Sequence, residues 1–261
     1  MVAAMSDDAW AELADQFVDE AYPTAKGRIR TCITHHQLLE HLAAPPVGVL
    51  DVGGGAGHQS FPLARLGHDV TVLDSSPAML GKAESRLARE DPGVRGRVRL
   101  VQARGEDAAE ATGGQQFAAV LCHGVIMYVA DPAPLITAVA ACTAPGGIAS
   151  IGALNANTLA VRPALERRWE DALDAFDARG ERGVLGVDTR ADTVEGLSDL
   201  VRHHRLDPVR WYGAWLFADW VDLADAGSEE VANAAAVELE ASRRDPYRQF
   251  SRGFHLIARR W

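Results

Sequence analysis

A glycine-rich loop is the stretch of this sequence whose residue types and spacing most directly indicate chemistry. The loop follows an apolar run at 47–52 and precedes a pattern typical of a helix; its glycines are Gly53, Gly54, Gly55 and Gly57. Glycine permits sharp turns and lets a ligand approach the main chain closely. A helix that begins directly after such a loop offers unpaired N–H groups and partial positive charge. These features predict a binding site at the end of a strand.

Two aspartates frame this loop. Asp51 precedes the glycines, and Asp74 ends the next apolar run, at 70–73. A carboxylate at the end of that second strand can accept hydrogen bonds from both hydroxyls of a ribose. The glycines follow the spacing G-x-G-x-G, which differs from the G-x-G-x-x-G of dinucleotide sites. We therefore expect a nucleoside ligand, and a nicotinamide dinucleotide or a plain glycine-rich turn is less favoured.

The elements that must position these residues alternate between strand and helix. Five apolar runs predict strands, at 47–52, 70–73, 98–102, 117–122 and 148–154. Helices are expected between them, including 78–89 and 134–143. Such alternation predicts a parallel sheet with right-handed crossovers and helices on both faces. Because ligands of these sheets bind at the carboxyl ends of the strands, the predicted site lies at that edge.

Residues 1–46 are expected to form an N-terminal helical cap. The apolar residues at 9–18 and at 29–42 have the spacing of amphipathic helices, and a turn is expected between them. That turn carries three cations, Lys26, Arg28 and Arg30. They form either a solvated basic turn or a site that holds an anion.

The second half of the chain predicts an insertion and a return to the sheet. Within 155–190, a charged amphipathic helix expected at 159–179 precedes a glycine-rich stretch, which favours an inserted lid. Residues 191–261 are expected to complete the same domain, with strands at 209–217 and 254–258. The chain is therefore expected to be an α/β protein, with a doubly wound, mostly parallel seven-stranded sheet whose core spans 47–154.

Composition narrows the class of protein. The formal net charge is −10, which disfavours a broad nucleic-acid footprint. The three cysteines, Cys32, Cys122 and Cys142, lack metal-ligand spacing, and an odd number of thiols suits a reducing cytoplasm. No apolar run is long enough for a membrane span, and no secretory signal is evident. We expect a cytoplasmic protein without a metal site or a membrane partner; a monomer and a homodimer remain equally possible.

The order of the motifs resembles that of class I S-adenosylmethionine (SAM)-dependent methyltransferases. After the glycine loop and Asp74 come Glu106-Asp107, the segment from His123 to Pro132, and Pro145-Gly146-Gly147. A narrower resemblance, to the SmtA-like tRNA carboxymethoxyuridine methyltransferase family, is carried by Phe17 to Arg30, Leu154-Asn155-Ala156, Asp245-Pro246-Tyr247 and Arg252 to His255. The resemblance implies a Rossmann-like fold and SAM as cofactor, with S-adenosylhomocysteine (SAH) as product.

The resemblance also implies roles for particular residues. Gly53, Gly54 and Gly55 would line the methionine side of the cofactor, and Asp74 with the adjacent Ser75 would hold the ribose. Glu106 and Asp107 would lie beside the adenine edge, and Met79 would pack on its face. Arg30 would pair with the cofactor carboxylate, since a planar guanidinium suits that group. His123 would end the fourth strand, facing cofactor or acceptor.

The methyl acceptor is the less determined half of the prediction. An alcohol acceptor needs a general base, for which His123 is the best-placed candidate, with Tyr22 and Asn155 as orienting residues. A carboxylate acceptor needs no base. The narrower family has an acidic residue and Trp where this chain has Met127-Tyr128, and the segment 158–187 lacks the lysines that would suit RNA.

Three functions follow as hypotheses. The favoured one is O-methylation of a small hydroxylated molecule, sugar-like or a secondary metabolite. The second is carboxyl methylation of a modified wobble uridine in tRNA, and the third is a non-catalytic cofactor-binding protein. The first and second hypotheses differ in the contacts that they require of five arginines, Arg162, Arg167, Arg168, Arg202 and Arg205. For tRNA several must face one groove, whereas for a small acceptor most should pair with nearby carboxylates such as Glu166, Glu170 and Asp171.

Overall fold

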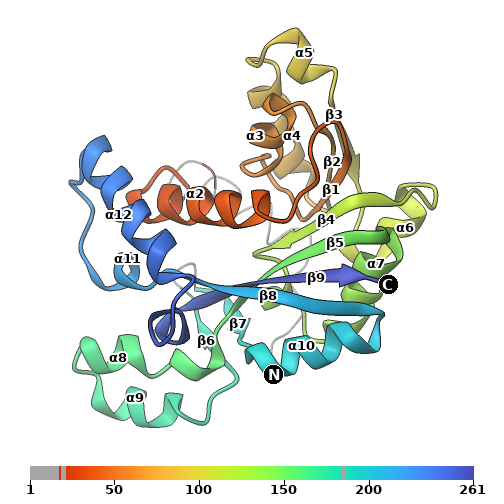
Figure 1. Cartoon of the computed structure of the whole chain (residues 1–261). Coiled ribbons are helices and arrows are strands. Elements are labelled where there is room, and N and C mark those ends of the chain that lie inside the picture. Colours follow the sequence, from red (N-terminus) through yellow and green to blue (C-terminus); the bar gives the residue numbers. More distant parts are fainter. Residues whose placement is uncertain (1–17, 19–21, 184–185) are drawn as a thin grey trace.

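The computed structural model describes residue 18 and residues 22–183 and 186–261, and it contains a seven-stranded sheet flanked by helices (Figure 1). The strands are β1 (Gly48–Val52), β2 (Asp69–Asp74), β3 (Val98–Gln102), β4 (Phe117–His123), β5 (Thr143–Leu154), β8 (Leu206–Ala214) and β9 (Gly253–Arg260). Their order is β3-β2-β1-β4-β5-β9-β8. Only β9 runs antiparallel to its neighbours, so the expected mostly parallel α/β sheet is confirmed.

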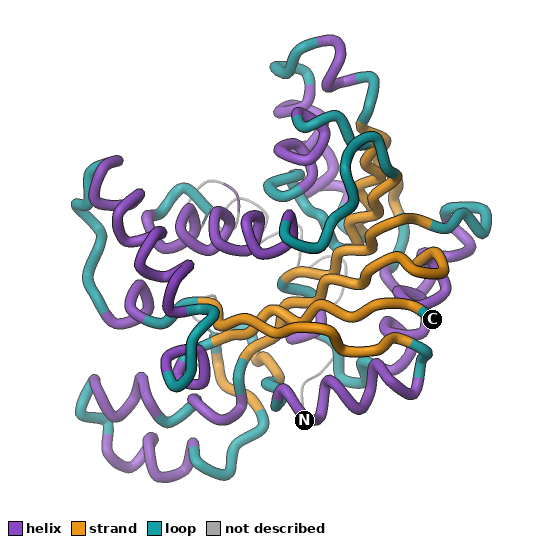
Figure 2. Tube along the Cα trace, viewed as in Figure 1, coloured by secondary structure: helices purple, strands orange, loops and turns teal. Residues whose placement is uncertain are grey.

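The two faces of the sheet are covered by different helices (Figure 2). Along β1, Leu50 and Val52 pack on one side, in a cluster with residues of α7 (Ala133–Cys142) and α10 (Val194–His203). Val49 packs on the other side, with Leu38 of α2 (Ala25–Leu39) and Leu63 of α3 (Ser60–Arg65). This alternation with a period of two explains why the central strands are apolar throughout: both of their faces are buried.

The remaining helices connect the strands and flank the sheet. They are α4 (Pro77–Leu87), α5 (Pro92–Arg95), α6 (Ala108–Ala111), α11 (Phe217–Trp220) and α12 (Ser228–Ala241). Short 3-10 turns lie at η2 (Gly105–Asp107), η3 (Ile126–Tyr128), η4 (Ala156–Thr158) and η5 (Tyr247–Phe250). Within the described residues, no helix combines the length and the apolar character that a membrane crossing requires.

The helix expected at 29–42 begins earlier in the chain than predicted. Helix α2 starts at Ala25, because the Thr24 side chain accepts a hydrogen bond from the Gly27 N–H at 3.0 Å and caps the first turn. Gly27 therefore lies inside the helix, buried, and is not part of a turn. The helix expected at 9–18 lies outside the described residues except for Val18, which packs against Met79.

The segment 155–190 does not contain the single long helix expected at 159–179. It folds into α8 (Val161–Leu165) and α9 (Trp169–Ala175), followed by a hairpin of β6 (Gly180–Arg182) and β7 (Asp188–Arg190). Arg167, with φ of 59°, adopts the left-handed conformation and ends the first helix. The backbone N–H of the next residue, Arg168, donates a hydrogen bond to the Pro163 carbonyl at 2.8 Å, and the polypeptide reverses its direction there. The charge pattern continues across this break, so it gives no sign of the turn.

Candidate active site

A cavity of about 650 Å³ lies along the carboxyl edge of the parallel strands. Residues from the ends of β2, β1, β4 and β5 line it in sheet order, starting with Asp74 and Gly53 and continuing with His123 and Leu154. Because β9 is antiparallel, its first residues reach the same edge, and Arg252 completes the row. The sheet order thus places Asp74 at one end of the cavity, Arg252 at the other, and His123 between them.

The glycine loop approaches its neighbours at distances that a side chain would not allow. Gly53 has φ of +67°, and a Cβ there would lie 2.3 Å from Cγ2 of Val125. Gly55 has φ of +51°, and its Cβ would lie 2.7 Å from Cε of Met79. The conformation favours glycine at both positions, and at Gly53 the space beside Val125 requires it as well, which keeps the loop backbone open to the cavity.

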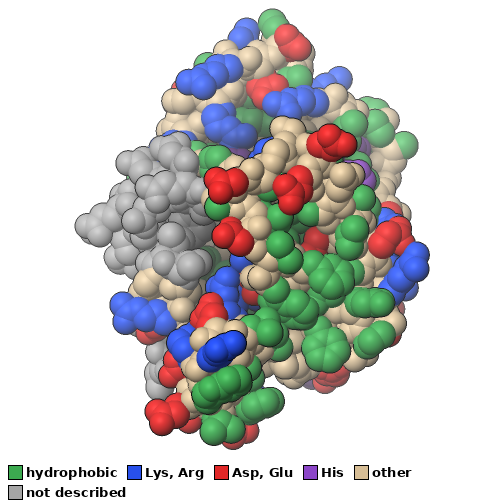
Figure 3. All heavy atoms as spheres, turned by 90° about the vertical axis from the view of Figure 1, so that its left-hand side faces the viewer, with side chains coloured by type: hydrophobic (Ala, Val, Ile, Leu, Met, Phe, Trp, Pro, Cys, Tyr) green, Lys and Arg blue, Asp and Glu red, His purple; other side chains and the backbone are tan. Residues whose placement is uncertain are grey.

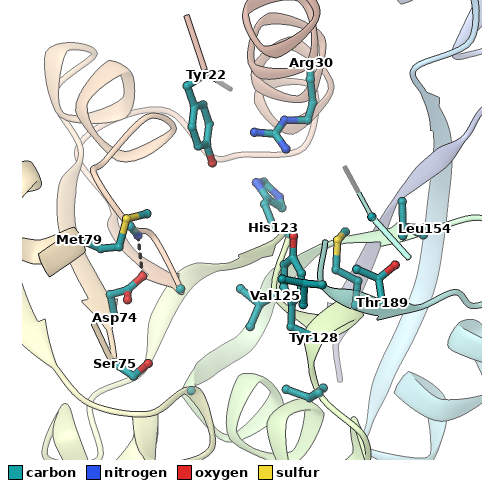
Figure 4. Close-up of a pocket in the computed structure, with 18 of the residues that line it drawn as sticks. Tyr22, Arg30, Asp74, Ser75, Met79, His123, Val125, Tyr128, Leu154 and Thr189 are labelled. Carbon is teal, nitrogen blue, oxygen red and sulfur yellow. Dashed lines mark hydrogen bonds between the residues drawn. The ribbon is translucent and has the colours of Figure 1, made fainter. Parts of the chain in front are cut away.

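Asp74 and its surroundings form the first half of the cavity. The carboxylate accepts hydrogen bonds from the backbone N–H groups of Gly55 and Ser76, each at 2.9 Å. Burial raises the pKa of Asp74, and these two donors oppose that shift. Ser75, Met79 and Glu106 also line this half, so most of the residues expected at the ribose and adenine are brought together (Figure 4).

Tyr22 and Arg30 cover the cavity from the N-terminal side (Figure 4). The Tyr22 ring stacks on His58, with ring centroids 3.7 Å apart. The Arg30 guanidinium carbon lies 4.7 Å from the centre of the Tyr22 ring and 5.1 Å from that of Trp215. Arg30 has no carboxylate partner among the residues that the structure describes, so its donors are available to a ligand.

His123 lies at the centre of the cavity, at the end of β4. Its Nε2 lies 2.8 Å from the Ser150 hydroxyl, and its buried Nδ1 has no hydrogen-bond partner in the described part of the chain. Burial, followed by the nearby charge of Arg30, lowers the pKa of His123 to about 3. The ring is therefore neutral at physiological pH.

A group of charged side chains forms the far half of the cavity. The carboxylate of Asp219, whose side chain is only 4% exposed, lies 2.9 Å from Lys26 Nζ and 3.3 Å from Arg162 Nη2. Arg252 approaches the same carboxylate at 3.8 Å and also pairs with Glu181. Three cations thus surround two carboxylates. The sequence analysis singled out the three cations, Lys26, Arg162 and Arg252, but neither of the two carboxylates with which they pair.

Three of the expected site residues do not line this cavity. At Gly54 a Cβ would lie 2.8 Å from Cγ of Asp51, so the residue faces the sheet, where it makes room for that carboxyl group. Asp107 is exposed, on the outer side of the 3-10 turn that contains Glu106. Asn155 is buried, and its carboxamide donates to the carbonyls of Gln249 and Ser251 at 3.2 and 3.0 Å. Asn155 thus lies outside this cavity, held by backbone carbonyls, and its expected role in orienting an acceptor stays an untested prediction.

The five arginines that distinguish RNA from a small acceptor are mostly paired. Arg168 pairs with Glu166 and Asp171, and Arg202 lies 2.8 Å from Asp199. Arg162 approaches Glu166 as well as Asp219. Basic and acidic side chains are interspersed over the face of the molecule that carries α8 and α9 (Figure 3). Within the described ranges, no group of three or more His, Cys, Asp or Glu side chains is arranged to hold a metal ion.

Comparisons with known proteins agree with this geometry. Residues 50–149 match the family model of a methyltransferase domain. The chain is 26% identical to the tRNA 5-carboxymethoxyuridine methyltransferase of Escherichia coli (strain K12), over 98% of this chain and 97% of that protein. Residues 50–149 thus match a methyltransferase domain, and the comparisons together indicate a class I SAM-dependent methyltransferase.

Other methyltransferases show the same relationship over shorter or more distant matches. A ubiquinone biosynthesis O-methyltransferase of Xanthomonas campestris pv. campestris (strain B100) is 32% identical over 57% of this chain and 60% of that protein. The fold matches that of magnesium protoporphyrin IX methyltransferase from Synechocystis PCC 6803 with bound SAH. The TM-score is 0.65 at 14% identity, over 98% of each chain. SAM is accordingly the cofactor of this methyltransferase.

Proposed function

We propose that the cofactor lies across the first half of the cavity. Asp74 would accept the ribose hydroxyls, Met79 would contact the adenine face, and Arg30 would pair with the cofactor carboxylate. Three observations support this orientation: the open backbone at Gly53 and Gly55, the partial burial of Asp74, and the guanidinium of Arg30, which has no carboxylate partner within the described residues. The segments 1–46 and 155–190 would act as a cap and a lid over the site.

We further propose that the acceptor is a hydroxyl group of a small molecule. The observation that carries this proposal is the buried Nδ1 of His123, which has no hydrogen-bond partner within the described residues and belongs to the side chain between the two halves of the cavity. When bound, the cofactor supplies a methyl group on a sulfonium for in-line transfer. An acceptor hydroxyl becomes strongly acidic as its oxygen gains the methyl group, so even a weakly basic imidazole can take the proton at Nδ1.

The paired arginines add support for a small acceptor. Phosphate contacts require free cations, whereas Arg162, Arg168 and Arg202 already lie against carboxylates.

A second candidate function is carboxyl methylation of a modified wobble uridine in tRNA. The cations around Asp219 favour it, since a carboxylate acceptor would be drawn to them, and the full-length match to a tRNA 5-carboxymethoxyuridine methyltransferase adds to it. A carboxylate acceptor would not need His123 as a base.

The chemical stability of the product separates the two functions. The enzyme would be given SAM labelled in its methyl group, with bulk tRNA and with a pool of hydroxylated metabolites in parallel. We expect label in a small product that survives mild base, because methyl ethers resist alkaline hydrolysis and methyl esters release methanol. Label in tRNA that base removes, with activity that falls steeply as salt is raised, would overturn the hydroxyl proposal in favour of the second function.

A further inference from the structure

A chain of buried polar side chains runs from the active site across β5 and β9 to α2, along one face of the sheet. His123 Nε2 lies 2.8 Å from Ser150 Oγ, which lies 2.6 Å from His255 Nε2. His255 Nδ1 lies 2.8 Å from Oε1 of Gln37, whose Nε2 donates to the Gly213 carbonyl at 3.2 Å. Ser150, His255 and Gln37 are each at most 1% exposed. Polar groups at such depth are costly unless every one is paired, so the chain is a built feature.

Adjacent strands bring the two imidazoles together. Gly152 of β5 is paired with His123 on one side and with His255 on the other. The two rings meet edge to face, with centroids 5.1 Å apart. Ser150, two residues earlier on the same face of β5, then lies within hydrogen-bond distance of both Nε2 atoms.

One backbone carbonyl sets the direction of every hydrogen bond that links these polar side chains. The Gly213 carbonyl can only accept, so the Gln37 amide must present its NH₂ group to it and its oxygen to His255. His255 therefore donates from Nδ1, which leaves its Nε2 to accept from the Ser150 hydroxyl. The Ser150 oxygen in turn accepts from Nε2–H of His123. The reverse direction would place the Gln37 oxygen against the Gly213 oxygen.

Both histidines are neutral, so each carries a single ring proton. Burial lowers the pKa of His255 well below its usual value, and burial with the nearby Arg30 does the same for His123. A neutral imidazole that donates from one nitrogen has a lone pair on the other. The two histidines are thereby assigned opposite tautomers: Nδ1–H for His255 and Nε2–H for His123.

We propose that Ser150, His255 and Gln37 are positioning residues that hold His123 in its Nε2–H tautomer and so keep the Nδ1 lone pair available to bound ligands. The side chain would then act only as an acceptor, which suits a ligand that donates a proton. The use of this lone pair toward an acceptor hydroxyl rests on the proposed function. The tautomer itself does not, because it follows from the hydrogen bonds of these side chains and from the neutral state of the two buried imidazoles.

Nitrogen NMR of the full chain with ¹⁵N-labelled histidine tests the tautomers directly, without any acceptor. His123→Gln and His255→Gln variants assign the two rings. We expect the Nε2 of His123 and the Nδ1 of His255 to carry the proton. Protonation of Nδ1 in His123, or the same tautomer in both rings, would overturn the proposal. Because no turnover is involved, that failure is distinguishable from failure of the proposed function.

Variants of Ser150 test the positioning role. Ser150→Ala removes the link, so we expect His123 to populate both tautomers and turnover to fall roughly ten-fold, as one lost hydrogen bond predicts. Ser150→Thr keeps the hydroxyl and should restore the single tautomer. Thr143→Val is the matched control. It removes another buried hydroxyl of β5, which donates to the Val139 carbonyl and takes no part in the hydrogen bonds that link His123 to Gln37. An unchanged tautomer in Ser150→Ala, or an equal shift in the control, would contradict the role.

Discussion

The backbone N–H of Gly55 donates a hydrogen bond to Oδ2 of Asp74 at 2.9 Å. This contact joins the glycine loop after β1 to the end of β2, so the carboxylate that would hold the ribose also fixes the loop beside it. The same carboxylate accepts from Ser76 N–H at the start of α4. One half-buried acidic side chain therefore organises three backbone segments at the edge where we propose that the cofactor binds.

Replacement of Asp74 should weaken cofactor binding. We expect Asp74→Ala to reduce the affinity for SAH by on the order of 2–3 kcal/mol, because hydrogen bonds to a charged acceptor are lost. Titration calorimetry measures the change. Asp69→Ala is the control, since it removes an exposed carboxylate at the other end of the same strand. Equal affinities of the wild type and Asp74→Ala would remove the ribose role from this residue.

Replacement of Arg30 should weaken binding only of ligands that carry the carboxylate. We expect Arg30→Ala to lower the affinity for SAH by about ten-fold or more, since a charge-assisted contact is lost. Its affinity for 5′-methylthioadenosine, which lacks the amino-acid group, should stay close to that of the wild type. The exposed neighbour Arg28→Ala serves as the control. An equal loss for both ligands would show that Arg30 supports the cavity and does not contact the carboxylate.

Acid should destabilise the fold in part through His58. Burial, followed by the charges of Arg86 and Arg30, lowers the pKa of His58 to about 3, whereas an unfolded histidine titrates near 6.5. Between these values the unfolded state binds more protons, so the free energy of unfolding falls as pH falls from about 6.5 toward 3, by up to about 1.4 kcal/mol per pH unit.

Urea unfolding at several pH values measures this effect. His58→Gln should gain stability relative to the wild type as pH decreases from 7 to 5, and the exposed His203→Gln should not. A constant difference between His58→Gln and the wild type across that range would mean that His58 titrates alike in the folded and unfolded states.

Much of the fold could be predicted because the signals were local. Apolar runs and glycines predict the core strands and their alternation with helices, and the carboxyl edge then collects Asp74 and His123. The place of Arg30, on α2, was expected only from the family resemblance. Gly54, Asp107 and Asn155 could not be placed in the same way. The direction of a side chain in a loop depends on tertiary partners, such as the Gln249 and Ser251 carbonyls that engage Asn155.

The polar chain behind His123 was also outside the reach of the sequence. A serine in the apolar run at 148–154 and a histidine in the run at 254–258 are the only local signs of it. Their pairing depends on the register that sets Gly152 opposite both His123 and His255. Likewise, the charged residues around Asp219 come from segments far apart in the sequence, so no local pattern links them.

The measurement that tests the account most directly compares catalysis and cofactor binding in His123→Ala. With the acceptor identified by labelled SAM, we expect turnover to fall about 10²–10⁴-fold, as loss of a general base predicts. The affinity for SAH should change little, and His203→Ala, an exposed histidine, should match the wild type in both. Weakened SAH binding with turnover intact at saturating SAM would contradict the account, because His123 would then be a cofactor contact.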